Sequence, residues 1–86
     1  MIELCYVGHL REDLDMDSEQ EQLQWRSDFK DVASLIDLLC SERGERWSST
    51  LHQENLLVSV NQAMVKPDHP LADGDEVVFF PPIAGG

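Results

Sequence analysis

The sequence is short of positive charge, of cysteine and of long hydrophobic runs. Lys and Arg together number 6 against 17 Asp and Glu in 86 residues, which gives a formal net charge of −11. Such an acidic chain is disfavoured as a direct ligand of nucleic acid or of an anionic membrane, and it favours basic protein partners. The alternative is that the charge serves only to keep a small domain in solution.

Signals for disulfides, metal sites and export are also lacking. Cys5 and Cys40 have no CxxC or other ligand spacing, so we expect neither a disulfide framework nor a metal centre. His9, His52 and His69 are too scattered along the chain to suggest a metal site, and we expect ordinary surface or capping roles for them. Because no export, lipidation or membrane-spanning signal is apparent, we expect a cytoplasmic protein.

Length and apolar spacing predict one small α+β domain. Hydrophobic residues make up 42% of the chain, enough for one sheet and one covering layer. Alternating apolar residues predict strands over 2–7, 20–25, 55–60 and 75–80, with a hairpin return at 64–65. The clearest helix begins at Asp31, a good N-cap, and ends at Gly44. Its apolar face consists of Val32, Leu35, Ile36, Leu39 and Cys40, and shorter helical turns are expected at 9–16 and 46–52.

The C-terminal segment combines a strand, a double proline and a diglycine. Pro81 and Pro82 fix φ and donate no amide hydrogen, so the strand should stop at Phe80 and continue as an extended tail. We therefore expect a domain over 1–80 and a flexible tail over 81–86. The predicted tail residues are Pro81, Pro82, Ile83, Ala84, Gly85 and Gly86. A frayed chain end would explain small residues there, but not this uninterrupted order.

The last strand predicts a surface beside the tail. Val77 and Phe79 share one face and should be core, whereas Val78 and Phe80 share the other. A single sheet covered by one helix leaves that second face without a partner, so we expect it to dock another protein together with Met64. The alternative is that the short helices cover these residues.

Residues 56–62 and 68–86 closely resemble the small subunits of molybdopterin synthase, the MoaD-type sulfur carriers. The resemblance extends to Arg46-Trp47 and, more weakly, to residues 10–12. Residues 13–30 depart from the pattern, and the glycine expected soon after Arg11-Glu12 is missing. The order of elements and the resemblance imply a ubiquitin-like β-grasp fold, with a mixed sheet covered by one main helix.

The resemblance also implies a function. A ubiquitin-activating-like enzyme would use ATP to adenylate Gly86, and a sulfur donor would then convert it to a thiocarboxylate. The tail would deliver this sulfur to cyclic pyranopterin monophosphate in the large synthase subunit, within a tetramer of two small and two large subunits. Docking would fall to Phe80, Val78 and Met64, and no cofactor would be bound permanently. The sequence shows no pairing of a nucleophile with a base, so we do not expect this chain to catalyse a reaction by itself.

Two other functions remain open. A sulfur carrier of the thiazole pathway has a similar tail, although such chains look shorter and lack a segment like 45–52. A ubiquitin-like modifier would instead join Gly86 to a lysine through an isopeptide bond.

Overall fold

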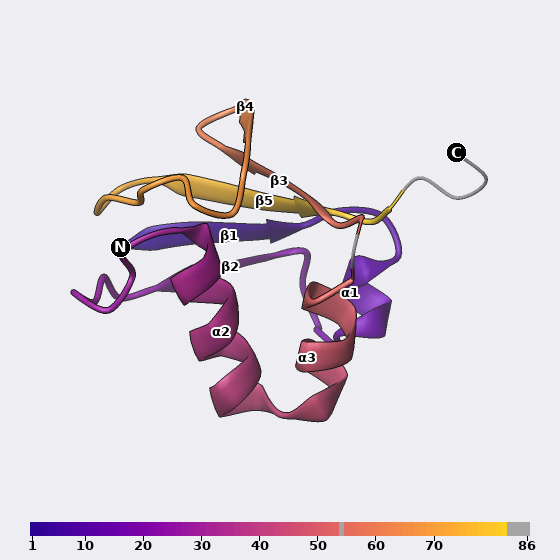
Figure 1. Ribbon diagram of the computed structural model, residues 1–86. Helices are drawn as coiled ribbons and strands as arrows, with labels where there is room; N and C mark the ends of the chain where they lie inside the picture. The colour runs from indigo at the N-terminus through magenta and orange to yellow at the C-terminus, as the bar shows by residue number, and fades with distance from the viewer. Residues whose placement is uncertain (54, 83–86) are drawn as a thin grey trace.

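The computed structural model describes residues 1–53 and 55–82, and its centre is a five-stranded mixed sheet. The strands are β1 (Ile2–Tyr6), β2 (Gln20–Leu23), β3 (Leu57–Val60), β4 (Ala63–Val65) and β5 (Glu76–Phe80), in the spatial order β2-β1-β5-β3-β4. β1 and β5 are parallel and the other pairs are antiparallel. This is the predicted ubiquitin-like β-grasp arrangement (Figure 1).

Three helices cover one face of the sheet: α1 (Leu10–Asp13), α2 (Val32–Arg43) and α3 (Glu45–Leu51) (Figure 1). The predicted limits of α2 are confirmed. The Asp31 carboxylate accepts a hydrogen bond from the Ser34 backbone N–H at 2.8 Å, and Gly44 ends the helix with a φ of +97°. The segment from α2 to α3 therefore turns sharply, and both helices lie under the same sheet.

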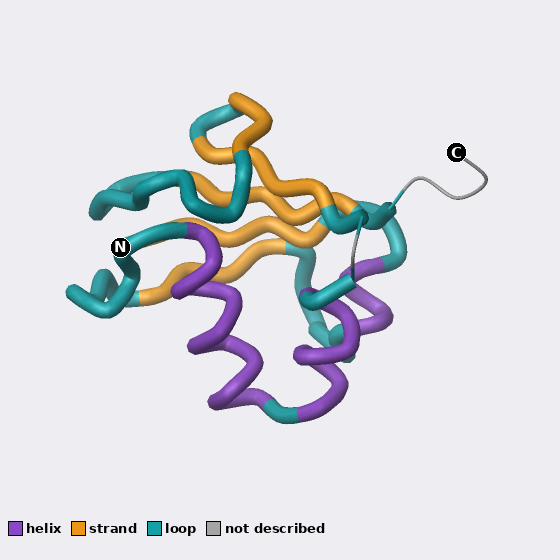
Figure 2. The backbone as a smooth tube through the Cα atoms, in the orientation of Figure 1, coloured by secondary structure: helices purple, strands orange, loops and turns teal. Residues whose placement is uncertain are grey.

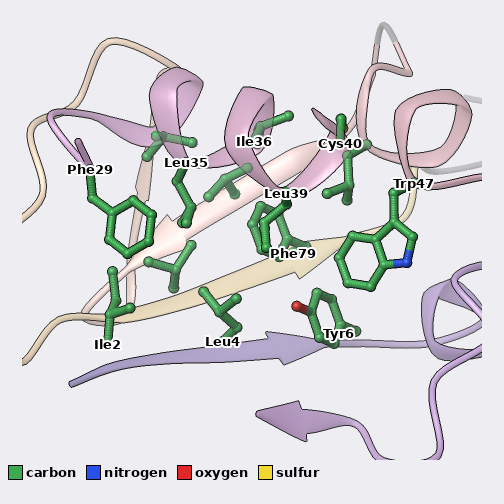
Figure 3. Packing of buried hydrophobic residues seen from close by; sticks show 14 of the residues in the cluster. Ile2, Leu4, Tyr6, Phe29, Leu35, Ile36, Leu39, Cys40, Trp47 and Phe79 are labelled. Atoms are coloured by element: carbon green, nitrogen blue, oxygen red, sulfur yellow. The ribbon is translucent and has the colours of Figure 1, made fainter. Parts of the chain in front are cut away.

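The core lies between the sheet and these helices (Figure 3). Tyr6 is central to it, because its ring stacks on Phe79 at 5.7 Å between ring centroids and meets Trp47 edge-on at 5.5 Å. The other core side chains that Figure 3 labels are Ile2, Leu4, Phe29, Leu35, Ile36, Leu39 and Cys40. The opposite side of the sheet, here called the open face, carries the alternate residues of each strand.

Two strands, β2 and β3, are each two residues shorter than the sequence predicts because of what lies opposite them. Leu23 pairs with Ile2, the first residue of β1, so β2 has no strand to pair with beyond Leu23. Leu57 pairs with Phe80, and the residue after Phe80 is a proline, which has no amide hydrogen for the ladder. β3 accordingly begins at Leu57 rather than at residue 55.

Two connections use left-handed backbone without glycine, namely the turn after α1 at Asp15 and the β3–β4 turn at Asn61 and Gln62. Asp15 has a φ of +57° and occupies the stretch where the expected glycine is missing. Aspartate tolerates this conformation, so a tight turn forms after α1, and Met16 donates its N–H to the Arg11 carbonyl at 2.9 Å. The longer connection over 66–75 returns the chain from β4 to β5 as a loop (Figure 2).

Candidate functional site

The open face carries an apolar strip at the end of the sheet where β5 stops. We define the apolar strip as Val7, Leu57, Met64, Val78 and Phe80. Strand register brings it together, because Leu57 lies opposite Phe80 and Ser59 lies between Met64 and Val78. Three of these side chains remain substantially exposed, Met64 at 57%, Leu57 at 40% and Val7 at 37%. Large apolar side chains gathered on one uncovered face indicate a surface for another protein.

The predicted docking residues lie on the predicted face. Met64 is the most exposed of them, whereas Val78 and Phe80 are half-buried because neighbouring strands crowd their sides. The alternative that helices cover them is wrong for the described residues, since α1, α2 and α3 all lie across the sheet from this face (Figure 1). Sequence reasoning missed Leu57 and Val7. Alternation along their strands was the available signal, but the partners across the sheet depend on register.

The base of the tail is held against the end of β1. The Val7 N–H donates to the Phe79 carbonyl at 3.1 Å, which keeps β1 and β5 paired up to the prolines. Pro81 and Pro82 are half-buried, and a Cβ on Gly8 would lie 3.2 Å from the Pro81 ring. Gly8 has a φ of +63°, so its lack of a side chain serves both the backbone turn and this close approach.

The remaining predicted tail residues, Ile83, Ala84, Gly85 and Gly86, lie outside the described residues. The described part of the tail therefore consists of the two prolines. They leave the domain beside Phe80, at the edge of the apolar strip. A partner that binds the strip is thereby brought next to the start of the tail.

Other reactive groups in the described part of the chain serve structure. Burial raises the pKa of the Cys5 and Cys40 thiols, so neither is an activated thiolate. His52 lies at the surface between the Ser48 hydroxyl at 3.1 Å and the Asp37 carboxylate at 3.2 Å, where it joins α3 to α2.

Residues 1–53 and 55–82 contain no candidate metal site and no candidate membrane-spanning helix. No cluster of three or more His, Cys, Asp or Glu side chains suited to a metal ion occurs there. The helices described over these ranges are all too short or too polar to cross a bilayer.

Comparison with known proteins identifies relatives along the whole chain. The model of the ThiS family matches residues 5–86. The molybdopterin synthase sulfur carrier subunit of Escherichia coli (strain K12) is 38% identical over 86 residues, which cover 100% of both chains. The protein of the same name from Haemophilus influenzae is 29% identical over 86 residues, again covering 100% of both chains.

Solved structures agree on the fold. Urm1 from Trypanosoma brucei has a TM-score of 0.75 at 24% identity, covering 99% of this chain and 94% of Urm1. A chain from the complex of subunits 1 and 2 of the molybdopterin-converting factor of Helicobacter pylori has a TM-score of 0.59 at 20% identity. The match covers 99% of this chain and 97% of that one. These likenesses establish the ubiquitin-like fold.

Proposed function

This chain belongs to the ThiS family, and within that family we propose that it acts as the sulfur carrier subunit of a molybdopterin synthase. The observation that carries the proposal is the apolar strip on the open face, at the base of a tail whose sequence ends in Gly-Gly. Full-length similarity to carrier subunits of that name supports the same role.

The proposed chemistry takes place at the Gly86 carboxylate. A carboxylate is a poor electrophile, so an activating enzyme first transfers AMP to it from ATP and releases pyrophosphate. A sulfur donor then displaces AMP and leaves a thiocarboxylate, which is a good nucleophile at neutral pH. Within the large subunit this sulfur attacks cyclic pyranopterin monophosphate and forms a thioester between the pterin and Gly86. Water then cleaves the bond between the Gly86 carbonyl and the sulfur, which regenerates the Gly86 carboxylate, and two such transfers supply the dithiolene of molybdopterin.

The fold suits the delivery of a reagent into a partner's cleft. Pro81 and Pro82 stiffen the start of the tail, and six residues at about 3.1 to 3.5 Å each could carry the carboxylate about 20 Å from the domain. Gly85 and Gly86 add no side chain at the tip. We propose that the large subunit binds the apolar strip, in a tetramer of two small and two large subunits. The Helicobacter pylori structure, a complex of subunits 1 and 2, supports such a partner.

The thiazole pathway is the alternative that the family name itself raises. The full-length curated relatives bear the synthase name, and α3 (Glu45–Leu51) forms the segment that thiazole-pathway carriers were expected to lack. Both observations favour the pterin pathway. A modifier function would appear as Gly86 joined to lysines of other proteins, which mass spectrometry of the chain from its own cells would detect.

The test extends the chain by one residue beyond Gly86. The extension touches no core residue and should leave the free energy of unfolding within about 0.5 kcal/mol of wild type. It should nevertheless abolish ATP–pyrophosphate exchange with the activating enzyme and sulfur transfer to the pterin precursor. The same residue added before Met1 is the control and should leave both reactions intact. If the extended chain is fully active, and mass spectrometry shows that it still carries the extra residue, Gly86 is not the reacting residue.

A further inference from the structure

Two glutamates of neighbouring strands, Glu3 and Glu76, lie in register on the open face. Glu3 of β1 pairs directly with Glu76 of β5, and adjacent strands lie about 4.8 Å apart. Like charges placed directly opposite each other destabilise a sheet. Among residues 1–53 and 55–82, neither carboxylate has a Lys, Arg or His nitrogen within 4.0 Å. Within the described part of the chain, the only hydrogen bond to either carboxylate comes from the Gln22 side-chain N–H, which donates to Glu3 at 3.2 Å.

This pair borders a groove of about 360 Å³ on the open face. Its lining includes Glu3, Cys5, Ser18, Gln20, Gln22 and Glu76. The carboxylates of Glu3 and Glu76 make the groove electronegative around the Cys5 thiol. Burial raises the pKa of that thiol. A hydrogen bond with the Gln20 side chain lowers the pKa, and the nearby carboxylates of Glu76, Glu3 and Glu19 raise it.

The groove is continuous with the apolar strip. Cys5 lines the groove and pairs in register with Val78, which belongs to the strip. Glu76 and Phe80 lie on the same face of β5 four residues apart, or about 13 Å along the strand. A protein interface of ordinary size, about 800 Å² on each partner, is wide enough to cover both the strip and the groove.

We propose that the groove receives a lysine or arginine side chain of the large subunit that docks on the apolar strip. This inference rests on the proposed function. A cation between Glu3 and Glu76 would turn their repulsion into two attractions, and these strengthen as the partner excludes water. The side-chain carbonyls of Gln20 and Gln22 are further acceptors for the several N–H donors of either cation.

The test compares stability with affinity in Glu3→Gln, Glu76→Gln and the double variant. Relief of repulsion should raise the melting temperature of the free chain by about 1 to 5 °C. Loss of the partner's counter-ions should weaken binding to the purified large subunit of the same organism by about three- to tenfold for each substitution. Glu45→Gln makes the same charge change at an exposed position of α3, across the sheet, and should bind like wild type.

Phe80→Ala separates this inference from the proposed function. This substitution removes an aromatic side chain from the strip and should weaken binding to the large subunit about 30-fold, as measured by calorimetric titration. If Phe80→Ala weakens binding while the Gln variants match Glu45→Gln, the groove proposal is wrong and the carrier function stands. The groove proposal would also be wrong if the Gln variants bind weakly and melt at a lower temperature than wild type, because Glu3 and Glu76 would then stabilise the fold rather than bind the partner. A wild-type chain that does not bind the large subunit at all would remove both proposals.

Discussion

The turn between β3 and β4 shows how single residues fix this fold. Asn61 and Gln62 are its two central residues, with φ values of +51° and +72°, as a type I′ turn requires. The Asn61 side chain donates to the Asp75 carboxylate at 2.9 Å and accepts from the Glu76 N–H at 3.0 Å. Asn61 thus ties the hairpin to β5, whereas no comparable side-chain bond is found for Gln62 in the described structure.

We expect opposite effects from glycine at the two turn positions. Gln62→Gly should raise the free energy of unfolding by about 0.5 to 1 kcal/mol, because glycine adopts positive φ without strain. Asn61→Gly should lower it by about 1 kcal/mol, because two hydrogen bonds are lost. Urea denaturation at neutral pH measures both. A destabilised Gln62→Gly variant would show that the turn is not strained at that position.

At the scale of elements, a polar cluster joins both sides of the core. The Tyr6 hydroxyl donates to Glu21 at 2.5 Å, and the Arg43 guanidinium donates to both oxygens of Glu21 at 2.6 and 3.0 Å. Arg43 also lies 4.5 Å above the Trp47 ring. These contacts connect the last turn of α2 to β2 and to α3.

This cluster predicts a specific loss of stability in acid. Burial raises the pKa of Glu21, but the hydrogen bonds from Arg43 and Tyr6 and the Arg43 charge outweigh it, so the pKa lies below its usual range. The ionised carboxylate therefore stabilises the fold above the unfolded pKa of about 4.3, and this contribution is lost as pH falls through the folded value.

The variant Glu21→Gln measures that contribution. Its deficit in the free energy of unfolding relative to wild type should be largest near neutral pH and should shrink below about pH 4. Urea midpoints between about pH 7 and pH 3 give the profile. Glu45→Gln, at an exposed helical position, is the control and should show no such trend. A Glu21→Gln deficit that is independent of pH would contradict the ion-pair explanation.

Elements defined by local sequence were predictable, and those defined by distant partners were not. The stripe and caps of α2 lie within 14 residues, from Asp31 to Gly44, and were predicted to the residue. The end of β2 depends on where β1 begins, and the start of β3 depends on Pro81. The alternation of apolar residues along one strand cannot predict either of these strand limits.

The candidate site divides in the same way. Val78 and Phe80 share a face by alternation along the last strand, and Met64 was expected beside them from the preceding hairpin. The register of β3 places Met64 and Val78 on either side of Ser59. Leu57 joins them only through its register with Phe80. The facing of Glu3 and Glu76 requires the parallel pairing of the first and last strands, which are separated by most of the chain.

At the scale of the whole molecule, the open face has two chemically different ends. β1 and β5 run in the same direction, from the acidic pair at one end to the apolar strip and the prolines at the other (Figure 1). The helical layer closes the opposite side. The proposed partner would meet an apolar anchor beside the tail and a negatively charged groove farther back, and these two different contacts would select one orientation of docking.

The net charge of −11 predicts that salt acts with opposite signs on folding and on association. Self-repulsion opposes the compact state, and ions screen it over a Debye length of about 10 Å at 0.1 M, so the melting temperature of the free chain should rise with NaCl. The same ions weaken the attraction of a basic partner, so the association rate with the large subunit should fall.

Thermal unfolding and stopped-flow mixing over about 0.02 to 0.3 M NaCl measure the two effects, a range in which the Debye length falls severalfold. NaCl and KCl at equal ionic strength should give the same changes, because screening depends on ionic strength and not on which cation carries it. A melting temperature that rises while the association rate stays flat would show that the acidic surface does not steer the partner. The charge would then serve solubility alone, and the apolar strip would have to account for recognition without help from the carboxylates.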